Sequence, residues 1–225
     1  MGLHDGHRKR LRERYRKEGL EHFEDHNCLE LLLFYSIPQR DTNPIAHNLL
    51  SHFGSLTNVF SAPVEELCKV EGITENSAVL ISMIPKLMSK VDRTEFKQES
   101  MNSAKILCDY CKTLFYGETE ERLKILCLDS KLRVVACEEV AKGTSGRIDF
   151  NIRSIIEIAF KHKTDVLVMT HNHPRTNSLP SNADLSATNR VKATLEGIGI
   201  KLLDHIIVGE KEVTSLKDGG FLFDL

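Results

Sequence analysis

The sequence contains no long apolar run, little net charge and no organised set of cysteines. Without a run of about 18 apolar residues, a membrane-spanning helix is excluded, and residues 1–7 lack the apolar stretch of a secretory signal. The 30 Lys and Arg nearly balance the 32 Asp and Glu, which excludes a generally polybasic nucleic-acid binder but not a local basic patch. Because the six cysteines are scattered, we expect thiols in a cytoplasmic protein rather than a disulfide framework.

The composition is otherwise that of an ordinary globular protein, apart from one excess. The 225 residues correspond to about one and a half domains of ~150 residues each. A chain of this length buries enough apolar surface to fold without a disulfide or a metal. The excess is in histidine, of which there are ten, and the question is whether their spacing organises any of them into a site.

Residues 1–92 are predicted to be all-helical. Apolar residues recur at helical spacing in segments that glycine and proline separate, as in the segment 44–53, which Gly54 closes. A further helix is expected to begin near Pro63, whose fixed φ suits a first turn. The chain then turns at Gly72 and resumes a helix at Glu75.

Beyond a polar segment at 93–103, which we interpret as a linker, the pattern predicts a mixed domain over 104–225. The alternation over 122–128, followed by a turn, predicts two strands that pair back as a hairpin. The expected elements are a helix at 104–116, strands at 122–128 and 132–140, a helix at 152–161, a buried strand at 165–170, a helix at 183–195, and strands at 201–208 and 212–216. The predicted fold class is therefore α/β (α+β), with a helical module before a mixed sheet.

The organised histidines are His171 and His173, directly after the predicted buried strand. Residues i and i+2 of an extended chain point to the same side, so both imidazoles can face one point. Pro174 ends the strand, and a predicted helix begins near Asp184, whose carboxylate can join them. Two His and one Asp leave a fourth tetrahedral position for water, which is the arrangement of a catalytic zinc site.

An alternative explanation exists for the acidic ligand. Ser181 and Asp184, placed before the apolar Leu185, also have the spacing of a capping box at a helix N-terminus. A capping role does not exclude a ligand role, because the helix N-terminus keeps Asp184 ionised. It is the combination with His171 and His173 that favours a metal site.

These residues carry a resemblance to a known family. His171 to Pro174, with Ser181 and Asp184, fit the His-x-His-x7-Ser-x2-Asp pattern of the JAMM (MPN+/JAB) metalloprotease domain. The sequence resembles the RadC-like family more closely, because the tract that begins Leu203-Asp204-His205 and the Gly143-Thr144 loop match that family in order. The resemblance covers residues 104–225, and the helical region is similar to the segment before this domain in RadC proteins. It implies a JAB1/MPN-like (cytidine-deaminase-like) mixed sheet with flanking helices.

The resemblance also implies the chemistry. It assigns one Zn²⁺ ion to His171, His173 and Asp184, with water as the fourth ligand. An upstream glutamate would act as the general base that takes a proton from this water. That glutamate corresponds to Glu121, which shares the parity of the apolar residues of its strand and is therefore expected to point inward. The Ser181 hydroxyl would stabilise the oxyanion. The fallback candidates for the base are Glu118, Glu138 and Glu139.

The sequence departs from the RadC-like pattern at one place beside the expected ligands. After the His-Asn-His-Pro motif the family usually has Ser-Gly, whereas this chain has Arg175-Thr176. The loss of glycine limits backbone freedom there, and Arg175 adds a positive charge. We therefore expect the ligands to be retained beside a substrate pocket that differs from the family's. His205 is expected in a core strand, near the site but not as a ligand.

The segment around Gly72 resembles a helix-hairpin-helix, in which amides at a helix N-terminus bind a DNA phosphate. Here Thr74 replaces the second glycine, and Ser77 stands where a basic residue is common. Glu71 and Glu75 place two carboxylates beside the turn. These substitutions favour a packing or protein-contact role over DNA binding.

Two functional classes follow. The first is a zinc-dependent metallohydrolase that cleaves a peptide or isopeptide bond, with a peptide or protein as substrate. The alternative is a nucleic-acid-associated protein, linked to DNA repair or recombination, in which the metal domain is structural. The basic stretch 8–17 could contact phosphates, but such runs are more typical of a solvated helix face. A His2Asp ligand set at neutral pH suits zinc.

Overall fold

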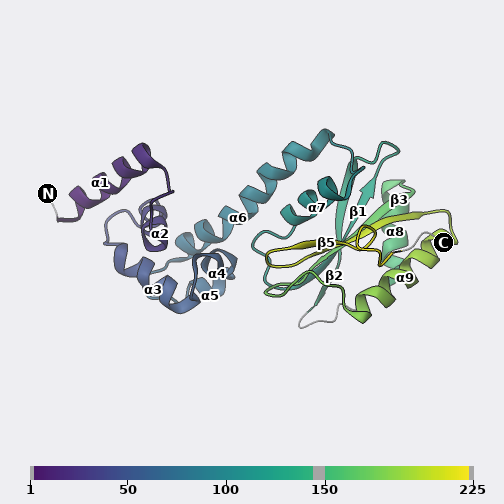
Figure 1. The fold of residues 1–225 in the computed structure, drawn as a ribbon. Helices are drawn as coiled ribbons and strands as arrows, with labels where there is room; N and C mark the ends of the chain where they lie inside the picture. The colour runs from purple at the N-terminus through teal and green to yellow at the C-terminus, as the bar shows by residue number, and fades with distance from the viewer. Residues whose placement is uncertain (1–2, 144–149, 223–225) are drawn as a thin grey trace. The chain divides into compact units, whose positions relative to one another are not determined.

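The chain divides into two compact units. The computed structural model describes residues 3–143 and 150–222, and the boundary falls between Leu87 and Met88 (Figure 1). The first unit is helical and the second contains a mixed sheet with helices on both faces. The predicted α+β class, with a helical region before a mixed sheet, is confirmed. Within the described ranges, none of the helices combines the length and the apolar character that crossing a bilayer requires.

The first unit packs short helices around one apolar core. Leu29 and Leu49 are fully buried in this core. α3 ends where Gly54 adopts a φ of 81°, the left-handed conformation that closes a helix. α4 was not predicted from the sequence, because six residues are too few to show a helical period. The helices are α1 (Leu3–Glu18), α2 (Asp25–Leu33), α3 (Asn43–Phe53), α4 (Leu56–Ser61), α5 (Val64–Leu67) and the beginning of α6 (Glu75–Glu95).

The hairpin between α5 and α6 is held by packing and by its own side chains. Gly72 has a φ of 89°, and a Cβ there would lie 2.8 Å from Cδ1 of Ile45. Thr74 Oγ1 accepts a hydrogen bond from the amide of Ser77 at 3.3 Å and so caps the first turn of α6. Ser77 is completely buried. The position where a helix-hairpin-helix often carries a basic residue is therefore inside the fold.

Two residues of the basic stretch 8–17 also stabilise the unit internally. The guanidinium of Arg8 donates hydrogen bonds to the carbonyls of Ile37 and Arg40 at 2.6 and 2.5 Å. The guanidinium of Arg14 stacks over the ring of Phe23 at 4.7 Å. These contacts tie α1 to the chain that follows it, so these two cations are not free for phosphates.

α6 extends further than the sequence indicated. It continues through Glu95, and a 3-10 turn (Phe96–Gln98) follows. The segment 93–103, which the sequence suggested as a linker, therefore begins as helix. Phe96 explains this extension, because its ring packs edge-on against that of Tyr110 at 5.6 Å, and an anchored apolar side chain orders the residues before it.

The sheet of the second unit has five strands within the described residues, in the order β2-β1-β3-β4-β5. β1 pairs antiparallel with both β2 and β3, β3 is parallel to β4, and β4 is antiparallel to β5. The predicted hairpin is confirmed, and its turn is closed by Asp129, whose Oδ1 accepts from the amides of Lys131 and Arg133, both at 2.9 Å. The strands are β1 (Glu121–Leu128), β2 (Val134–Gly143), β3 (Val166–Asn172), β4 (Lys201–Val208) and β5 (Val213–Ser215).

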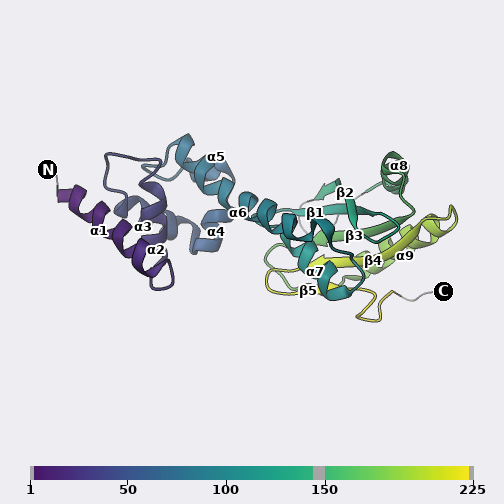
Figure 2. The ribbon, with the colours of Figure 1, turned by 90° about the horizontal axis from the view of Figure 1, so that it is seen from above.

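Helices cover both faces of this sheet (Figure 2). α7 (Ala104–Thr113) packs on the face that includes Leu126, and α8 (Ile152–His162) and α9 (Asn182–Glu196) pack on the face that includes Ile125. Alternate residues of β1 thus serve opposite cores, as the pleat requires. Glu121 is an even number of residues from Ile125 and was predicted to point to the same side. It therefore lies on the face of the sheet that α8 and α9 cover.

The connection between β3 and β4 creates the setting for the site. Because the two strands are parallel, the chain must cross over between them, and α9 makes this crossover. β3 also runs two residues beyond the predicted strand, since Asn172 still pairs with Val208. Gly143 is the last residue of β2, and the remainder of the predicted loop, from Thr144, lies outside the described residues.

Candidate metal centre

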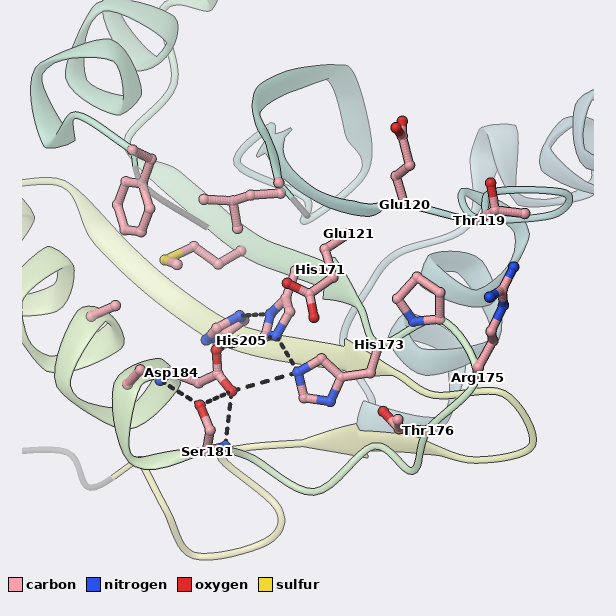
Figure 3. Close-up of a pocket in the computed structure, with 17 residues that line it drawn as sticks. Thr119, Glu120, Glu121, His171, His173, Arg175, Thr176, Ser181, Asp184 and His205 are labelled. Atoms are coloured by element: carbon pink, nitrogen blue, oxygen red, sulfur yellow. Dashed lines mark hydrogen bonds and ion pairs between the residues drawn. The ribbon is translucent and has the colours of Figure 1, made fainter. Parts of the chain in front are cut away.

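Three side chains from β3 and α9 converge on one point. His171 Nε2 lies 2.9 Å from His173 Nε2 and 3.3 Å from Asp184 Oδ1 (Figure 3). His173 Nε2 lies 3.6 Å from Asp184 Oδ2. The extended backbone continues past the end of β3, because the amide of His173 donates to the carbonyl of Val208 at 2.8 Å. This explains why the two histidines, two residues apart, face the same side.

A chain of hydrogen bonds behind His171 fixes which of its nitrogens carries the proton. The Thr188 hydroxyl donates to the carbonyl oxygen of Asp184 at 2.6 Å, since a carbonyl can only accept. With its hydrogen used, this hydroxyl must accept from Nδ1 of His205, 2.5 Å away. Burial holds the pKa of His205 well below its usual range. His205 is therefore neutral, with an unprotonated Nε2.

The polarity of this chain continues to the centre. His205 Nε2 lies 2.8 Å from His171 Nδ1, so Nδ1 of His171 is the donor and its Nε2 keeps a lone pair. Nδ1 of His173 faces the carbonyl oxygen of Asn177 at 3.1 Å and is therefore also a donor, which leaves its Nε2 to face the centre. His173 Nε2 lies 2.9 Å from His171 Nε2, so in the metal-free protein a proton on His173 bridges the two nitrogens, and a metal ion would take its place. The donor set therefore fits a metal ion, which two imidazole nitrogens and a carboxylate bind well.

Asp184 supplies the negative charge of this centre. Burial opposes its ionisation, but the contacts with His171 and His173 outweigh burial and hold its pKa far below the usual range. The hydrogen bond with Asp184 raises the pKa of His173. Asp184 also lies in the first turn of α9, where the helix dipole favours a carboxylate. Within the described residues, the His, Cys, Asp and Glu side chains that could hold a metal are His171, His173 and Asp184.

Ser181 and Asp184 form the capping box that the sequence suggested. Asp184 Oδ2 accepts from the Ser181 amide at 2.8 Å and from its hydroxyl at 2.6 Å, while the Asp184 amide donates to Ser181 Oγ at 3.2 Å. Capping and metal binding are compatible, because Oδ1 of Asp184 faces His171. The Ser181 proton is directed at Asp184 in this arrangement, so its predicted oxyanion role requires that the hydroxyl rotate.

Glu121, the predicted general base, lies at the edge of the same centre. Its carboxylate points towards His171 and His173, whereas Glu120 points away (Figure 3). The fallback candidates are engaged elsewhere. Glu118 and Glu139 pair with Arg122 at 2.6 and 2.8 Å, and Glu138 pairs with Lys161 at 2.7 Å and His162 at 2.8 Å.

Asn172, between the two histidines, holds the start of β1 in place, a role that sequence reasoning missed. Its Oδ1 accepts from the amide of Arg122 at 2.8 Å, and its Nδ2 donates to the carbonyl of Glu120 at 3.0 Å. These two bonds bracket Glu121. Asn172 is buried, so its amide group joins the strand that carries the histidines to the residue that would act as base.

Comparison of the sequence with known proteins identifies the family of the chain. Residues 101–221 match the RadC-like JAB domain, and residues 6–79 match the UPF0758 N-terminal domain. The chain belongs to the RadC-like JAB domain family. It is 34% identical to a UPF0758 protein of Ruegeria pomeroyi over 217 residues, covering 96% of this chain and 97% of that protein. A UPF0758 protein of Rhodobacter capsulatus is 32% identical over 94% of this chain and 100% of its own length. A UPF0758 protein of Fusobacterium nucleatum is 32% identical over 96% of this chain and 97% of its own length.

The departure from the usual RadC-like loop has a structural consequence that the sequence did not indicate. The residue with a positive φ is Arg175, at 68°, rather than Thr176, where the family usually has glycine. Losing that glycine therefore causes no strain at Thr176, and the unfavourable backbone is carried by Arg175. Arg175, the centre and Glu121 all line one pocket of about 540 Å³.

Proposed function

We propose that this RadC-like protein is a zinc-dependent hydrolase of peptide or isopeptide bonds. One observation carries the proposal: two imidazole Nε2 atoms and a carboxylate converge in a pocket that Glu121 also lines. His171, His173 and Asp184 would hold one zinc ion. Bound zinc would polarise a water molecule and the scissile carbonyl, lowering the pKa of the water towards ~7.

The chain's own residues would move the protons. Glu121, beside His171 and His173, would accept the proton of the attacking water on a carboxylate oxygen and deliver it to the leaving amine. Asn172 would keep Glu121 in place through its two bonds to the neighbouring peptide groups. The Thr188 and His205 chain would keep Nε2 of His171 free of a proton.

Ser181 would contribute as a hydrogen-bond donor to the oxyanion. Its hydroxyl donates to Asp184 Oδ2 at 2.6 Å, and rotation about its side-chain bond would redirect that proton into the pocket. The loss of a single oxyanion donor typically lowers the rate about 10²- to 10³-fold. Ser181→Ala is therefore expected to keep its metal and lose most of its turnover, apart from a smaller loss of helix stability through the cap.

Metal analysis of the purified protein tests the ligands. Wild type is expected to carry about one zinc per chain, and His171→Ala/His173→Ala to carry almost none. Equal zinc in both proteins would refute the ligand assignment.

A pool of internally quenched peptides tests the hydrolysis. Glu121→Gln is expected to retain zinc and to lose peptide cleavage. The matched control is Glu120→Gln, one residue away but directed outwards, which is expected to keep both zinc and cleavage. Loss of zinc from Glu121→Gln would make Glu121 a ligand or a structural residue instead of a base.

A further inference from the structure

Arg175 has a backbone conformation that its side chain does not favour. Its φ of 68° lies in the left-handed region, where a residue with a Cβ is disfavoured and glycine is not. Arg175 is the third residue of a β-turn in which the Thr176 amide donates to the carbonyl of His173 at 3.4 Å, a position with positive φ that usually carries glycine. Disfavoured backbone of this kind persists where the surrounding structure enforces it and is concentrated at functional sites.

The surrounding loop does enforce it. On one side of Arg175 the amide of His173 is bonded to the carbonyl of Val208 at 2.8 Å, and on the other the carbonyl of Thr176 accepts from the amide of Glu210 at 2.9 Å. Gly209 lies so close to the loop that a Cβ on it would come within 2.6 Å of the Ser178 nitrogen. Fixed points on both sides set the position from which the Arg175 side chain extends.

The side chain lies in the wall of the candidate active-site pocket. Figure 3 shows Arg175 at the end of the pocket away from Ser181 and Asp184. Thr119 and Thr176 line the pocket with it and add two hydroxyl groups. Arg175 is exposed, so its guanidinium is accessible to a molecule that enters the pocket.

The charges of the pocket leave this guanidinium without a partner. Glu120 is neutralised by Lys142 at 2.6 Å. Glu121 and Asp184 face the histidines. Among the described residues that line the pocket, Arg175 is the cation that no carboxylate pairs with. With a divalent ion in the centre, the pocket would carry a surplus of positive charge and attract an anion.

We propose that Arg175 binds a carboxylate of the substrate, so that the protein selects peptides with an acidic group to one side of the scissile bond. A guanidinium binds a carboxylate through two parallel N–H···O bonds, which gives direction as well as strength. The acidic group is an Asp or Glu side chain or a free chain end. This inference rests on the proposed zinc hydrolase function and adds a substrate class to it.

Zinc-binding thiol probes test the inference without requiring turnover. The probes are mercaptoacetyl-Gly-Asp-amide with its Asn counterpart, and mercaptoacetyl-Gly-Gly with a free or an amidated end, titrated calorimetrically into the zinc-loaded protein. An acidic probe is expected to bind wild type about tenfold more tightly than its neutral counterpart. The pair that shows the preference identifies the source of the carboxylate.

Variants at the same position assign the preference to Arg175. Arg175→Gln is expected to bind acidic and neutral probes equally, and Arg175→Lys to keep part of the preference. Arg175→Gly also relieves the backbone, so it serves as a well-folded second variant. Arg153→Gln, on α8 and outside the pocket lining, removes the same charge and is expected to leave the preference unchanged.

The outcomes separate the two proposals. Equal binding of acidic and neutral probes to wild type, or a preference that survives in Arg175→Gln, would overturn only the proposed role of Arg175 and not the proposed hydrolase function. Failure of all four probes to bind zinc-loaded wild type would overturn the proposed function and this inference with it.

Discussion

Replacing Thr188 with valine tests the hydrogen-bond chain that prepares His171 for a metal. Thr188 is almost fully buried, and valine has nearly the same shape, so the substitution removes the hydroxyl and little else. That hydroxyl accepts from His205 and donates to the carbonyl of Asp184. Without it, Nδ1–H of His205 has no acceptor.

The magnitude follows from the two ways the chain can respond. An unsatisfied buried donor costs about 1–3 kcal/mol. The metal-free protein can avoid this cost by moving the His205 proton from Nδ1 to Nε2 of His205. His205 Nε2 then donates to Nδ1 of His171, and the proton of His171 moves from its Nδ1 to its Nε2. Metal binding must reverse this change, and 1–3 kcal/mol corresponds to roughly a five- to 150-fold weaker affinity at 1.36 kcal/mol per tenfold. Partners behind metal-binding histidines typically contribute about 10- to 100-fold.

The assay is zinc competition with a chromophoric chelator, applied to wild type, Thr188→Val and Thr188→Ser. Thr188→Ser keeps the hydroxyl and is expected to bind zinc like wild type. The reasoning is refuted if Thr188→Val binds zinc within about twofold of wild type while remaining folded in the same urea range.

Three further predictions concern other contacts. Asn172→Ala is expected to keep its zinc and to lose about 1–3 kcal/mol of unfolding free energy in urea, because two partly buried hydrogen bonds, each contributing about 0.5–1.5 kcal/mol, are lost. Burial raises the pKa of Asp204 above its usual value, so its ionisation is unfavourable in the folded state. Stability that Asp204 contributes below about pH 4 is therefore lost as pH rises through the raised pKa. In urea unfolding, the free energy of unfolding of Asp204→Asn is expected to increase relative to that of wild type as the pH rises over that range. Arg12→Glu/Arg16→Glu is expected to bind a DNA duplex no more weakly than wild type in fluorescence anisotropy at low salt.

Each of these has a contradicting result. Full stability of Asn172→Ala would mean that its two hydrogen bonds contribute nothing measurable. A difference between Asp204→Asn and wild type that stays constant with pH would show that this carboxyl does not titrate differently on folding. Salt-sensitive DNA binding by wild type that the Arg12 and Arg16 substitutions abolish would favour the nucleic-acid function.

Local sequence signals accounted for most of the fold. Strand alternation in 122–128 and the Asp129 turn are short-range features, and the hairpin they predict is confirmed. The spacing of Ser181 and Asp184 correctly predicted a capping box, because capping is decided within one helical turn. The short helix α4 was missed because periodicity needs more residues than it has.

The spacing also selected the residues that the structure brings together at the centre, but not those that support them. The bond between Asn172 and Glu120 joins positions 52 residues apart, and that between His171 and His205 joins positions 34 residues apart. No periodicity links residues across such distances, since their contact depends on strand pairing. The position of Thr188 could have been predicted from the sequence, because Thr188 follows Asp184 by four residues and so lies on the same helix face.

The loop over residues 174–181 carries Arg175 but none of the three candidate metal ligands. His171 lies in β3, the amide of His173 bonds to Val208 of β4 and Asp184 lies in α9, while Nδ1 of His173 also faces the carbonyl oxygen of Asn177 in the loop. Arg175 belongs to the loop. Under the proposed function, substitutions at Arg175 would change which peptides are accepted while the ligands keep their places, so a new selectivity would need only a few changed residues in this loop.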